Sequence, residues 1–341
     1  MLFPGNSPGC PSSRSEEVGQ RVQISRFNRK DNRVLVYHPL HFMSPWISAF
    51  RPRTLPLALA SILTGGFLAA AAGRFNGSVV ALAALTTVLL QVLSNLANDY
   101  GDSQNGADSI HREGPRRAVQ SGAITLAQMK RGMLICGLLA FASGLALLWV
   151  ALGVAGVGLL LGFLALGLAA IWAAVNYTAG ARPYGYAGLG DVSVFLFFGL
   201  VGVCGTYFLQ AHTLPLAVLL PAAALGCFAT AVLNVNNIRD IKSDVLAGKI
   251  TIPVRLGPLH ARRYHWLLLV LGLGCATVYV ALTYNHSPWQ WLYVLSAPLF
   301  LFNAIQIWQR QESMQVDPLL KQMALSTLVF TVLFGVGQVV G

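Results

Sequence analysis

The sequence predicts an all-α integral membrane protein, with nine transmembrane helices in a bundle around a central cavity. Charged residues make up 10% of the chain, whereas they make up about a quarter of a typical soluble domain. They are absent from six long stretches, and the basic residues fall almost entirely on one side of the predicted membrane. These observations argue against a large soluble helical protein.

The six stretches without Asp, Glu, Lys or Arg cover residues 54–73, 75–98, 132–181, 192–238, 264–309 and 322–341. A spanning helix needs about 20 largely apolar residues, so three stretches hold one helix each and the three longer stretches hold two. Each longer stretch has a bend signal inside it, at Gly153–Gly158, His212–Pro215 or Asn285–Pro288. The count is therefore nine spans.

The basic residues orient these spans. With the N-terminus in the cytoplasm and the C-terminus outside, every Lys and Arg except Arg74 lies on the cytoplasmic side. This follows the positive-inside rule and predicts a multi-pass membrane protein. We expect it in the cell inner membrane, with a plastid membrane as the alternative. The net charge of +11 then lies along an anionic leaflet. Because the charges are spread over loops, they indicate the lipid bilayer as partner and no nucleic acid; nothing in the sequence indicates an oligomeric state.

Residues 1–43 differ from the rest of the chain. This polar, basic leader has no apolar run of the kind that a secretory signal needs. We expect it to be disordered or to precede the true start of translation, because Met43 stands directly before the first span. The membrane domain then covers residues 44–341.

Two acidic clusters recur with the same internal spacing. Asn98 and Asp102 precede Asn236 and Asp240 by 138 residues, and each pair falls at the predicted cytoplasmic end of a span, the second or the sixth. An offset of four helices preserves direction, so the two sites can face each other across a bundle. Internal repeats often place a site at their interface in this way.

The composition of the clusters indicates a cation site. Outside the leader the chain has nine acidic residues, and five of them are in the two clusters. Acids at the end of an apolar helix are costly and point to function. Mg²⁺ takes oxygen ligands and is usually bound through a few carboxylates plus substrate phosphates. Two facing carboxylate sets therefore fit a diphosphate held through Mg²⁺; the alternative is a set of solvated loop acids that balance nearby Arg and Lys.

Several basic residues lie near the clusters. Arg and Lys bind phosphate oxygens and carboxylates, which makes Arg116, Lys249 and Arg182 candidate binding residues, although each would also serve as a positive-inside anchor. The sequence contains no GxGxxG, Walker A or GxSxG motif and no zincin-type His pair. Nucleotide-driven transport and serine hydrolysis therefore lack their usual motifs.

Five separated segments carry a family resemblance: residues 51–56 (RPRTLP), 95–102 (NLANDYGD), 182–191 (RPYGYAGLGD), 233–240 (LNVNNIRD) and 248–251 (GKIT). In these segments the chain resembles the UbiA superfamily of intramembrane prenyltransferases, and within it the branch that prenylates 1,4-dihydroxy-2-naphthoate. The resemblance covers residues 44–341. Asp108 stands six residues after Asp102, whereas the broad superfamily pattern has its third acid four residues after the second. This difference puts the role of Asp108 as a metal ligand in doubt.

The resemblance implies a reaction and its residues. A polyprenyl group passes from polyprenyl diphosphate to 1,4-dihydroxy-2-naphthoate, with loss of CO₂ and diphosphate, giving demethylmenaquinone. The implied Mg²⁺ ligands are Asn98, Asp99, Asp102, Asp240 and Asp244. The four carboxylates and Lys249 are the implied catalytic groups. The implied substrate-binding residues are Asn98, Arg53, Arg116, Arg182, Tyr177, Tyr184, Asn236 and Arg239, of which Arg182, Tyr177 and Tyr184 would orient the acceptor carboxylate.

Other functions remain open. Within the superfamily, 4-hydroxybenzoate prenylation, phytyl transfer to naphthoate and haem farnesylation use the same chemistry. An ion-coupled transporter also uses paired intramembrane carboxylates, but it should carry them near the middle of the bilayer on broken helices. A CDP-alcohol phosphotransferase should show one compact Asp-rich motif rather than two distant ones.

Overall fold

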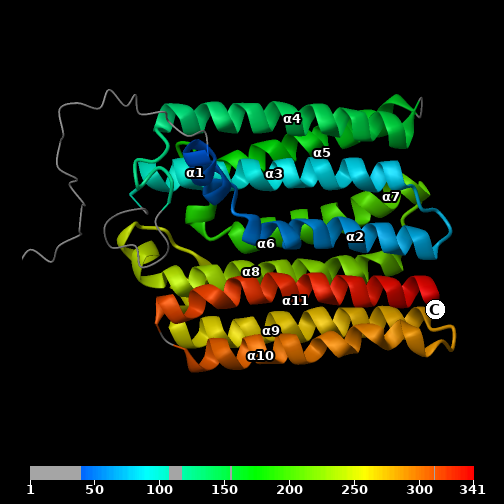
Figure 1. The fold of residues 1–341 in the computed structure, drawn as a ribbon. Helices are drawn as coiled ribbons and strands as arrows, with labels where there is room; N and C mark the ends of the chain where they lie inside the picture. Colours follow the sequence, from blue (N-terminus) through cyan, green and yellow to red (C-terminus); the bar gives the residue numbers. More distant parts are fainter. Residues whose placement is uncertain (1–39, 107–116, 154–155, 311) are drawn as a thin grey trace, which may run out of the picture. The chain divides into compact units, whose positions relative to one another are not determined.

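The computed structural model describes residues 40–106, 117–153, 156–310 and 312–341, and these ranges contain helices and turns but no strand (Figure 1). The elements in chain order are α1 (Leu40–Phe50), η1 (Pro52–Thr54), α2 (Leu55–Ala71), α3 (Gly77–Gln104), α4 (Leu126–Leu152), α5 (Val157–Asn176), η2 (Tyr184–Ala187), α6 (Gly190–Val194), η3 (Phe195–Cys204), α7 (Gly205–Ala211), η4 (Leu216–Val218), α8 (Leu219–Leu246), α9 (Ile252–Thr283), η5 (Pro288–Ser296), α10 (Ala297–Gln309) and α11 (Ser313–Val340). Helix α1 begins inside the last residues of the predicted leader, whose residues 1–39 lie outside the described part of the chain.

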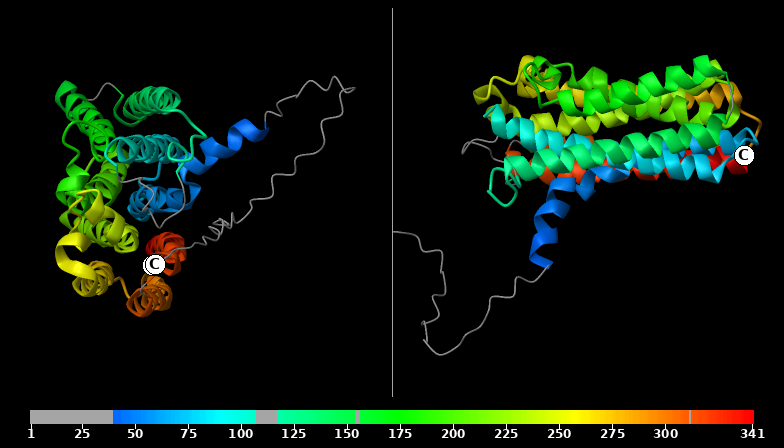
Figure 2. Two further views of the ribbon diagram at one scale, coloured as in Figure 1. Left: turned by 90° about the vertical axis from the view of Figure 1, so that its left-hand side faces the viewer. Right: turned by 90° about the horizontal axis from the view of Figure 1, so that it is seen from above.

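The prediction of nine spans is confirmed. Among the described residues, nine helical segments are long and apolar enough to cross a membrane. All three predicted bends separate consecutive spans: α4 from α5, α7 from η4, and α9 from η5. The long helices run side by side in Figure 1, and Figure 2 shows the same bundle end-on. Four of these spans join more than one element: α1 with η1 and α2, α6 with η3 and α7, η4 with α8, and η5 with α10.

Local sequence signals explain where several spans begin. The Asn76 side chain accepts hydrogen bonds from two backbone amides of the first turn of α3. Thr125 and Gln128 form a capping box at the start of α4. The Thr251 hydroxyl accepts from the Val254 amide at the start of α9. Each cap satisfies amides that have no partner inside the helix.

Close helix packing depends on small residues in the spans. A Cβ on Gly199 would lie 2.6 Å from the Ala222 carbonyl oxygen of α8, and one on Gly202 would lie 2.8 Å from Ser61 Cβ of α2. Both glycines lie in η3, a π-helical stretch. The span of α6, η3 and α7 can therefore approach α2 and α8 at backbone distance, as packing between helices in lipid requires.

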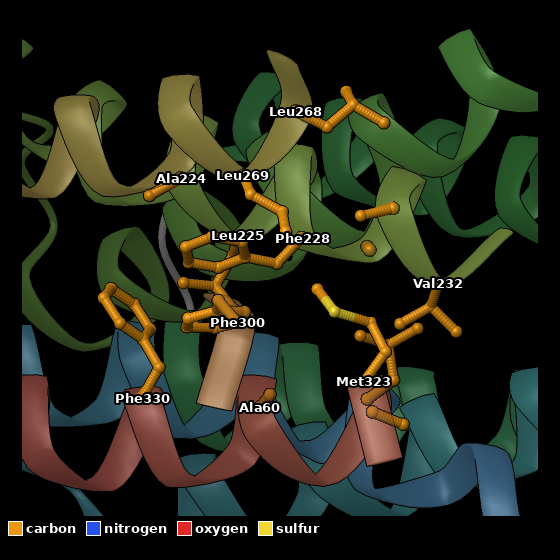
Figure 3. Close-up of a cluster of buried hydrophobic side chains, with 14 of the residues drawn as sticks. Ala60, Ala224, Leu225, Phe228, Val232, Leu268, Leu269, Phe300, Met323 and Phe330 are labelled. Atoms are coloured by element: carbon orange, nitrogen blue, oxygen red, sulfur yellow. The ribbon is translucent and has the colours of Figure 1, made fainter. Parts of the chain in front are cut away.

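An aromatic core stabilises the C-terminal half of the bundle (Figure 3). The Phe228 ring stacks on Phe300 with centroids 4.4 Å apart and meets Phe330 edge-on at 4.9 Å. These rings come from α8, α10 and α11. Burial is uneven across the bundle: α8 is mostly buried, whereas Ala173 is the one buried residue described in α5. The element that carries the second acidic cluster is thus also the most enclosed one.

Candidate active site

The two acidic clusters lie at the C-terminal ends of α3 and α8. Asp99 and Asp102 belong to the last turns of α3, and Asp240 and Asp244 to the last turns of α8. None of these four residues is more than 5% exposed. Each span reaches its polar end only after a long apolar run, so the carboxylates are held in place by packed helix. Buried charges of this kind need partners, and the structure supplies them.

Two arginines pair with the first cluster. The Arg51 guanidinium binds the Asp99 carboxylate, and the Arg117 guanidinium binds the Asp102 carboxylate. Arg117 also donates to the Asn98 carbonyl oxygen at 2.9 Å. Arg51 precedes the first long span, and Arg117 opens the segment before α4. Residues distant in sequence therefore enclose the end of α3.

The second cluster is organised by Arg239. Its guanidinium binds both carboxylate oxygens of Asp240 at 2.7 Å and donates to the Asn236 side chain at 2.9 Å. It also pairs with Asp317 of α11, which in turn accepts from Arg53 at 3.1 Å. Asp317 thus connects the segment before α2, the end of α8 and the start of α11.

Residues 177–189, between α5 and α6, bridge the two clusters. The Thr178 hydroxyl donates to the Asn98 side-chain oxygen at 2.9 Å. Gly101 permits this approach, because a Cβ at that position would collide with the Thr178 carbonyl group. The Tyr186 hydroxyl donates to Asp102 at 2.8 Å, and the Ile250 amide donates to the Tyr186 carbonyl oxygen at 2.9 Å. One loop therefore contacts the ends of both helices.

Tyr186 also lies among charged groups of both clusters. Its ring lies 5.5 Å from the Lys249 ammonium, which pairs with Asp244 at 3.6 Å. Burial raises the pKa of the Tyr186 hydroxyl, and the negative charges of Asp102 and Asp244 raise it further. The hydroxyl therefore keeps its proton and remains a donor at neutral pH. Asp102 of the first cluster and Asp244 of the second both interact electrostatically with the Tyr186 hydroxyl. The two clusters therefore lie on either side of Tyr186.

A cavity of about 360 Å³ adjoins both clusters. Its polar end is lined by Asn98, Asp102, Arg117, Asn236 and Lys249. The rest of the lining is largely apolar, from α2, α3, α4, α5, α8 and the α6–η3–α7 span. Along α3 it extends from Ala83 to Asp102, a distance of about 29 Å at 1.5 Å per residue. A charged head and a long apolar chain would both find complementary walls here.

The structure brings most of the predicted residues together, at different positions relative to the cavity. Asn98, Asp102, Asn236, Lys249, Tyr177 and Tyr184 line the cavity. Asp99, Asp240, Asp244 and Arg239 are buried beside it. Arg53 binds Asp317 away from the lining, and Arg182 is exposed and also away from it. Arg116 and Asp108 lie outside the described residues.

Sequence reasoning missed four members of the site: Arg51, Arg117, Tyr186 and Asp317. Arg51 and Arg117 each stand two or fewer residues from a predicted residue, Arg53 or Arg116, so the motif was found but the contacting side chain was not. Tyr186 lies in the segment that carries the resemblance. Asp317 gave a signal that could have found it, because it is one of few acids outside the clusters and stands at the start of an apolar span.

The donor set fits a magnesium ion shared with a phosphate ligand. In the described part of the chain, no three His, Cys, Asp or Glu residues lie close enough together to hold a metal without help. Mg²⁺ is usually bound by one or two carboxylates with waters and substrate phosphates, and carboxylate and amide oxygens are present at both helix ends. Asp244 Oδ2 is buried without a hydrogen-bond partner, so one acceptor is available for a cation.

The fold and the site define a class: a polytopic membrane protein with two carboxylate–amide clusters at the end of an apolar intramembrane cavity. The chain belongs to the UbiA prenyltransferase family, whose sequence profile matches residues 58–328. It is 47% identical over 292 residues to the 1,4-dihydroxy-2-naphthoate octaprenyltransferase of Escherichia coli, covering 86% of this chain and 94% of that protein. The enzymes with the same description from Haemophilus influenzae and Mycobacterium tuberculosis are 46% and 36% identical, over 87% and 84% of this chain and 96% and 93% of theirs.

Solved structures share the fold at low sequence identity. A UbiA homologue from Archaeoglobus fulgidus superposes with a TM-score of 0.60 at 15% identity, covering 87% of this chain and 100% of that one. A homologue from Aeropyrum pernix gives a TM-score of 0.59 at 17% identity, covering 86% and 98%. The chain is therefore an intramembrane prenyltransferase by family, and its bundle is the family's fold.

Proposed function

We propose that this protein transfers a polyprenyl group from polyprenyl diphosphate to 1,4-dihydroxy-2-naphthoate, releasing diphosphate and CO₂ and forming demethylmenaquinol, the reduced form of demethylmenaquinone. The names of its relatives support this choice of acceptor. The observation that carries the proposal is the single cavity that joins the two acidic clusters to a long apolar chamber. Such a cavity suits a donor with an anionic head and a hydrocarbon tail.

The diphosphate would bind between the ends of α3 and α8. Asn98, Asp99, Asp102, Asp240 and Asp244 are the proposed Mg²⁺ ligands, with Asn236 beside them. Mg²⁺ bound there would neutralise the leaving diphosphate as a Lewis acid. Lys249 and Arg117 line the same end of the cavity and would stabilise charge on the departing oxygens, because fixed cations in a water-poor site act strongly on developing charge.

Arginines pair with three of these carboxylates and fix their orientation. Arg239 chelates Asp240 and binds Asn236, so it fixes the orientation of two proposed ligands at once. Arg53 acts on Arg239 only through Asp317, and we assign it a positioning role. Arg116 keeps its sequence-based assignment to the diphosphate.

The acceptor would bind between the diphosphate and residues 177–189. Tyr177 and Tyr184 line the cavity there, with ring centroids 5.4 Å apart in an edge-to-face arrangement. Aromatic edges and faces suit a flat naphthalene ring. Arg182 lies on the exposed part of this loop, where it would attract the acceptor carboxylate as it approaches. The apolar walls exclude water from the allylic cation.

Turnover by the purified protein tests this function. Protein is incubated with polyprenyl diphosphate, 1,4-dihydroxy-2-naphthoate and Mg²⁺, and product is followed by mass spectrometry. We expect demethylmenaquinone from the wild type, none with Asp102→Ala, and normal yield with Glu312→Gln, an exposed acid that is not part of the cavity lining. Product from 4-hydroxybenzoate alone would keep the reaction and overturn the acceptor. No product from any aromatic acceptor, in folded protein, would overturn the enzyme.

We further propose that the cluster end of the bundle faces the cytoplasm of a cell with an inner membrane. The proposal follows from the positive-inside rule, since Arg51, Arg117, Lys249 and their basic neighbours are at that end and Arg74 is at the other. A reporter fused after Gly341 tests it: activity of a periplasmic reporter is expected, and activity of a cytoplasmic reporter would reverse the orientation.

A further inference from the structure

Asp191 is a buried carboxylate that the proposed function leaves unused. It stands at the start of α6 and is 7% exposed. The structure records no ion pair between Asp191 and any described Lys, Arg or His, and its Oδ2 atom has no hydrogen-bond partner. The four cluster carboxylates and Asp317 all pair with Arg or Lys. An unpaired buried carboxylate in a membrane protein is costly and calls for a functional explanation.

Three elements surround this carboxylate. The Tyr264 side chain from α9 faces it. The Thr230 hydroxyl from α8 lies 3.4 Å from the Asp191 carbonyl oxygen. From residues 177–189, the Tyr177 hydroxyl lies against Gly190, where a Cβ would approach it to 2.7 Å. Glycine at 190 therefore leaves the space that brings the Tyr177 hydroxyl next to Asp191.

Tyr177 connects this carboxylate with the cavity. Its side chain lines the cavity beside Tyr184 and Ser193, whereas Asp191 lies behind that wall. Burial raises the pKa of Tyr177, and the negative charge of Asp191 is the next largest cause. Tyr177 thus carries its proton at neutral pH and is no base by itself. Its position between the cavity lining and Gly190 suits a proton relay from the cavity to a group behind it.

We propose that Asp191, acting through Tyr177, accepts the hydroxyl proton of the aromatic acceptor during prenyl transfer and returns it afterwards. This rests on the proposed function. As the ring carbon that carries the carboxylate attacks the allylic carbon, the acceptor hydroxyl gives its proton to Tyr177, and Tyr177 gives its own to Asp191. The ring oxygen becomes a ketone, and the C–O bond to diphosphate breaks with its electron pair on oxygen. When CO₂ leaves, its bonding pair returns to the ring, and the oxygen recovers the proton along the same path.

The atoms and charges balance without another reactant. The ring loses CO₂ instead of a proton, so the proton that Asp191 accepts returns to the acceptor oxygen and Asp191 ends the cycle deprotonated. In this scheme Tyr177 touches the acceptor and is a catalytic residue, while Asp191 is a positioning residue and proton store. The titratable groups facing Asp191 are Tyr177 and Tyr264; Tyr184 lies beside Tyr177, and Cys227 of α8 lies beside Tyr264. None of these four side chains is a carboxylate or an imidazole, so no other described group of those kinds competes there as base.

The decisive experiment compares Asp191→Asn, Tyr177→Phe and the double variant. General bases contribute about 10²- to 10⁴-fold to rate, so we expect each single variant to lose about 100-fold in turnover with an unchanged KM for polyprenyl diphosphate. Residues that act as one unit are not additive, so the double variant should lose no more than either single one. If the fold-loss in turnover of the double variant equals the two single fold-losses multiplied together, the relay is overturned.

A pH profile separates this role from a structural one. Phenols ionise near pH 10 in water, so the phenolate fraction of the acceptor rises about tenfold per pH unit below that value. At subsaturating acceptor, Asp191→Asn should recover about tenfold per unit between pH 7 and 9, while the wild type changes little. Asp191→Glu restores the carboxylate and should retain most activity, which keeps the test valid if the Asn variant is unstable. A loss that no pH recovers, or an active Asn variant at pH 7, would overturn the proposal. If the wild type forms no product, the proposed function fails instead.

Discussion

Removal of the Tyr186 hydroxyl should weaken diphosphate binding without unfolding the site. Tyr186→Phe deletes the donor to Asp102 and keeps the ring beside Lys249. A hydrogen bond to an ionised group contributes about 1.5–3 kcal/mol net. Asp102 keeps its Arg117 partner, so we take the lower value, which corresponds to about tenfold in a binding constant. The expected result is a tenfold rise in the half-saturating concentration of polyprenyl diphosphate.

Tyr186→Ala separates the ring from the hydroxyl. It also removes the cation–π contact with Lys249, which is worth about 1 kcal/mol in a partly desolvated site, so a further loss of about fivefold is expected. The measurement is turnover at varied donor concentration and saturating Mg²⁺, with Tyr284→Phe, an exposed tyrosine of an interhelical turn, as the matched control. Because the pKa of Tyr186 is raised by burial and by Asp102 and Asp244, its hydroxyl remains a donor at alkaline pH. The deficit of Tyr186→Phe should therefore be equal at pH 7 and pH 9. A Phe variant within twofold of the wild type would refute the reasoning that this hydroxyl positions Asp102.

Three further predictions concern the surroundings of the site. Gly101→Ala should cost about 1–3 kcal/mol of stability and most of the activity, because its Cβ would collide with the Thr178 carbonyl group. Thermal unfolding measures this against Gly144→Ala, a control position where a Cβ has room. Equal melting temperatures for the two variants would contradict the prediction. Asp317→Asn should lower stability by about 1–2 kcal/mol, since Arg239 loses one of two carboxylate partners, and should raise the KM for donor; an unchanged KM would limit Asp317 to stability. Removal of Mg²⁺ with EDTA should abolish turnover and Mg²⁺ should restore it, and activity that survives EDTA would exclude the metal.

Much of the fold was predictable because charge in a membrane protein is restricted to its ends. The uncharged runs fixed the number of spans, and Gly153, Pro215 and Pro288 marked where the longer runs turn. The π-helical stretch in the span of α6, η3 and α7 was not predictable. Within it Gly199 and Gly202 meet α8 and α2, and such contacts join residues that lie far apart in the chain.

The acidic clusters were predictable because their spacing repeats, whereas their partners were not. Arg117 is a partner of Asp102, and the path of the loop between α3 and α4, which brings it there, left no signal in the sequence. Asp317 and Arg53 are 264 residues apart, so nothing local relates them. Arg182 resembles a binding residue by type and position, yet the backbone of its loop turns it outward. The sequence thus predicted where the polar end of the cavity lies, whereas tertiary contacts determine which side chains pair with the carboxylates there.

Helix α5 has a consequence for where this enzyme works. Several of its residues line the cavity while Ala173 alone among its described residues is buried, so on its outer side the chamber wall is backed by hydrocarbon from the bilayer. Acyl-chain length and order should then set how far α5 can yield to a long prenyl tail. The surrounding lipid becomes part of the enzyme's selectivity, and the preferred tail length in detergent should differ from that in native membranes.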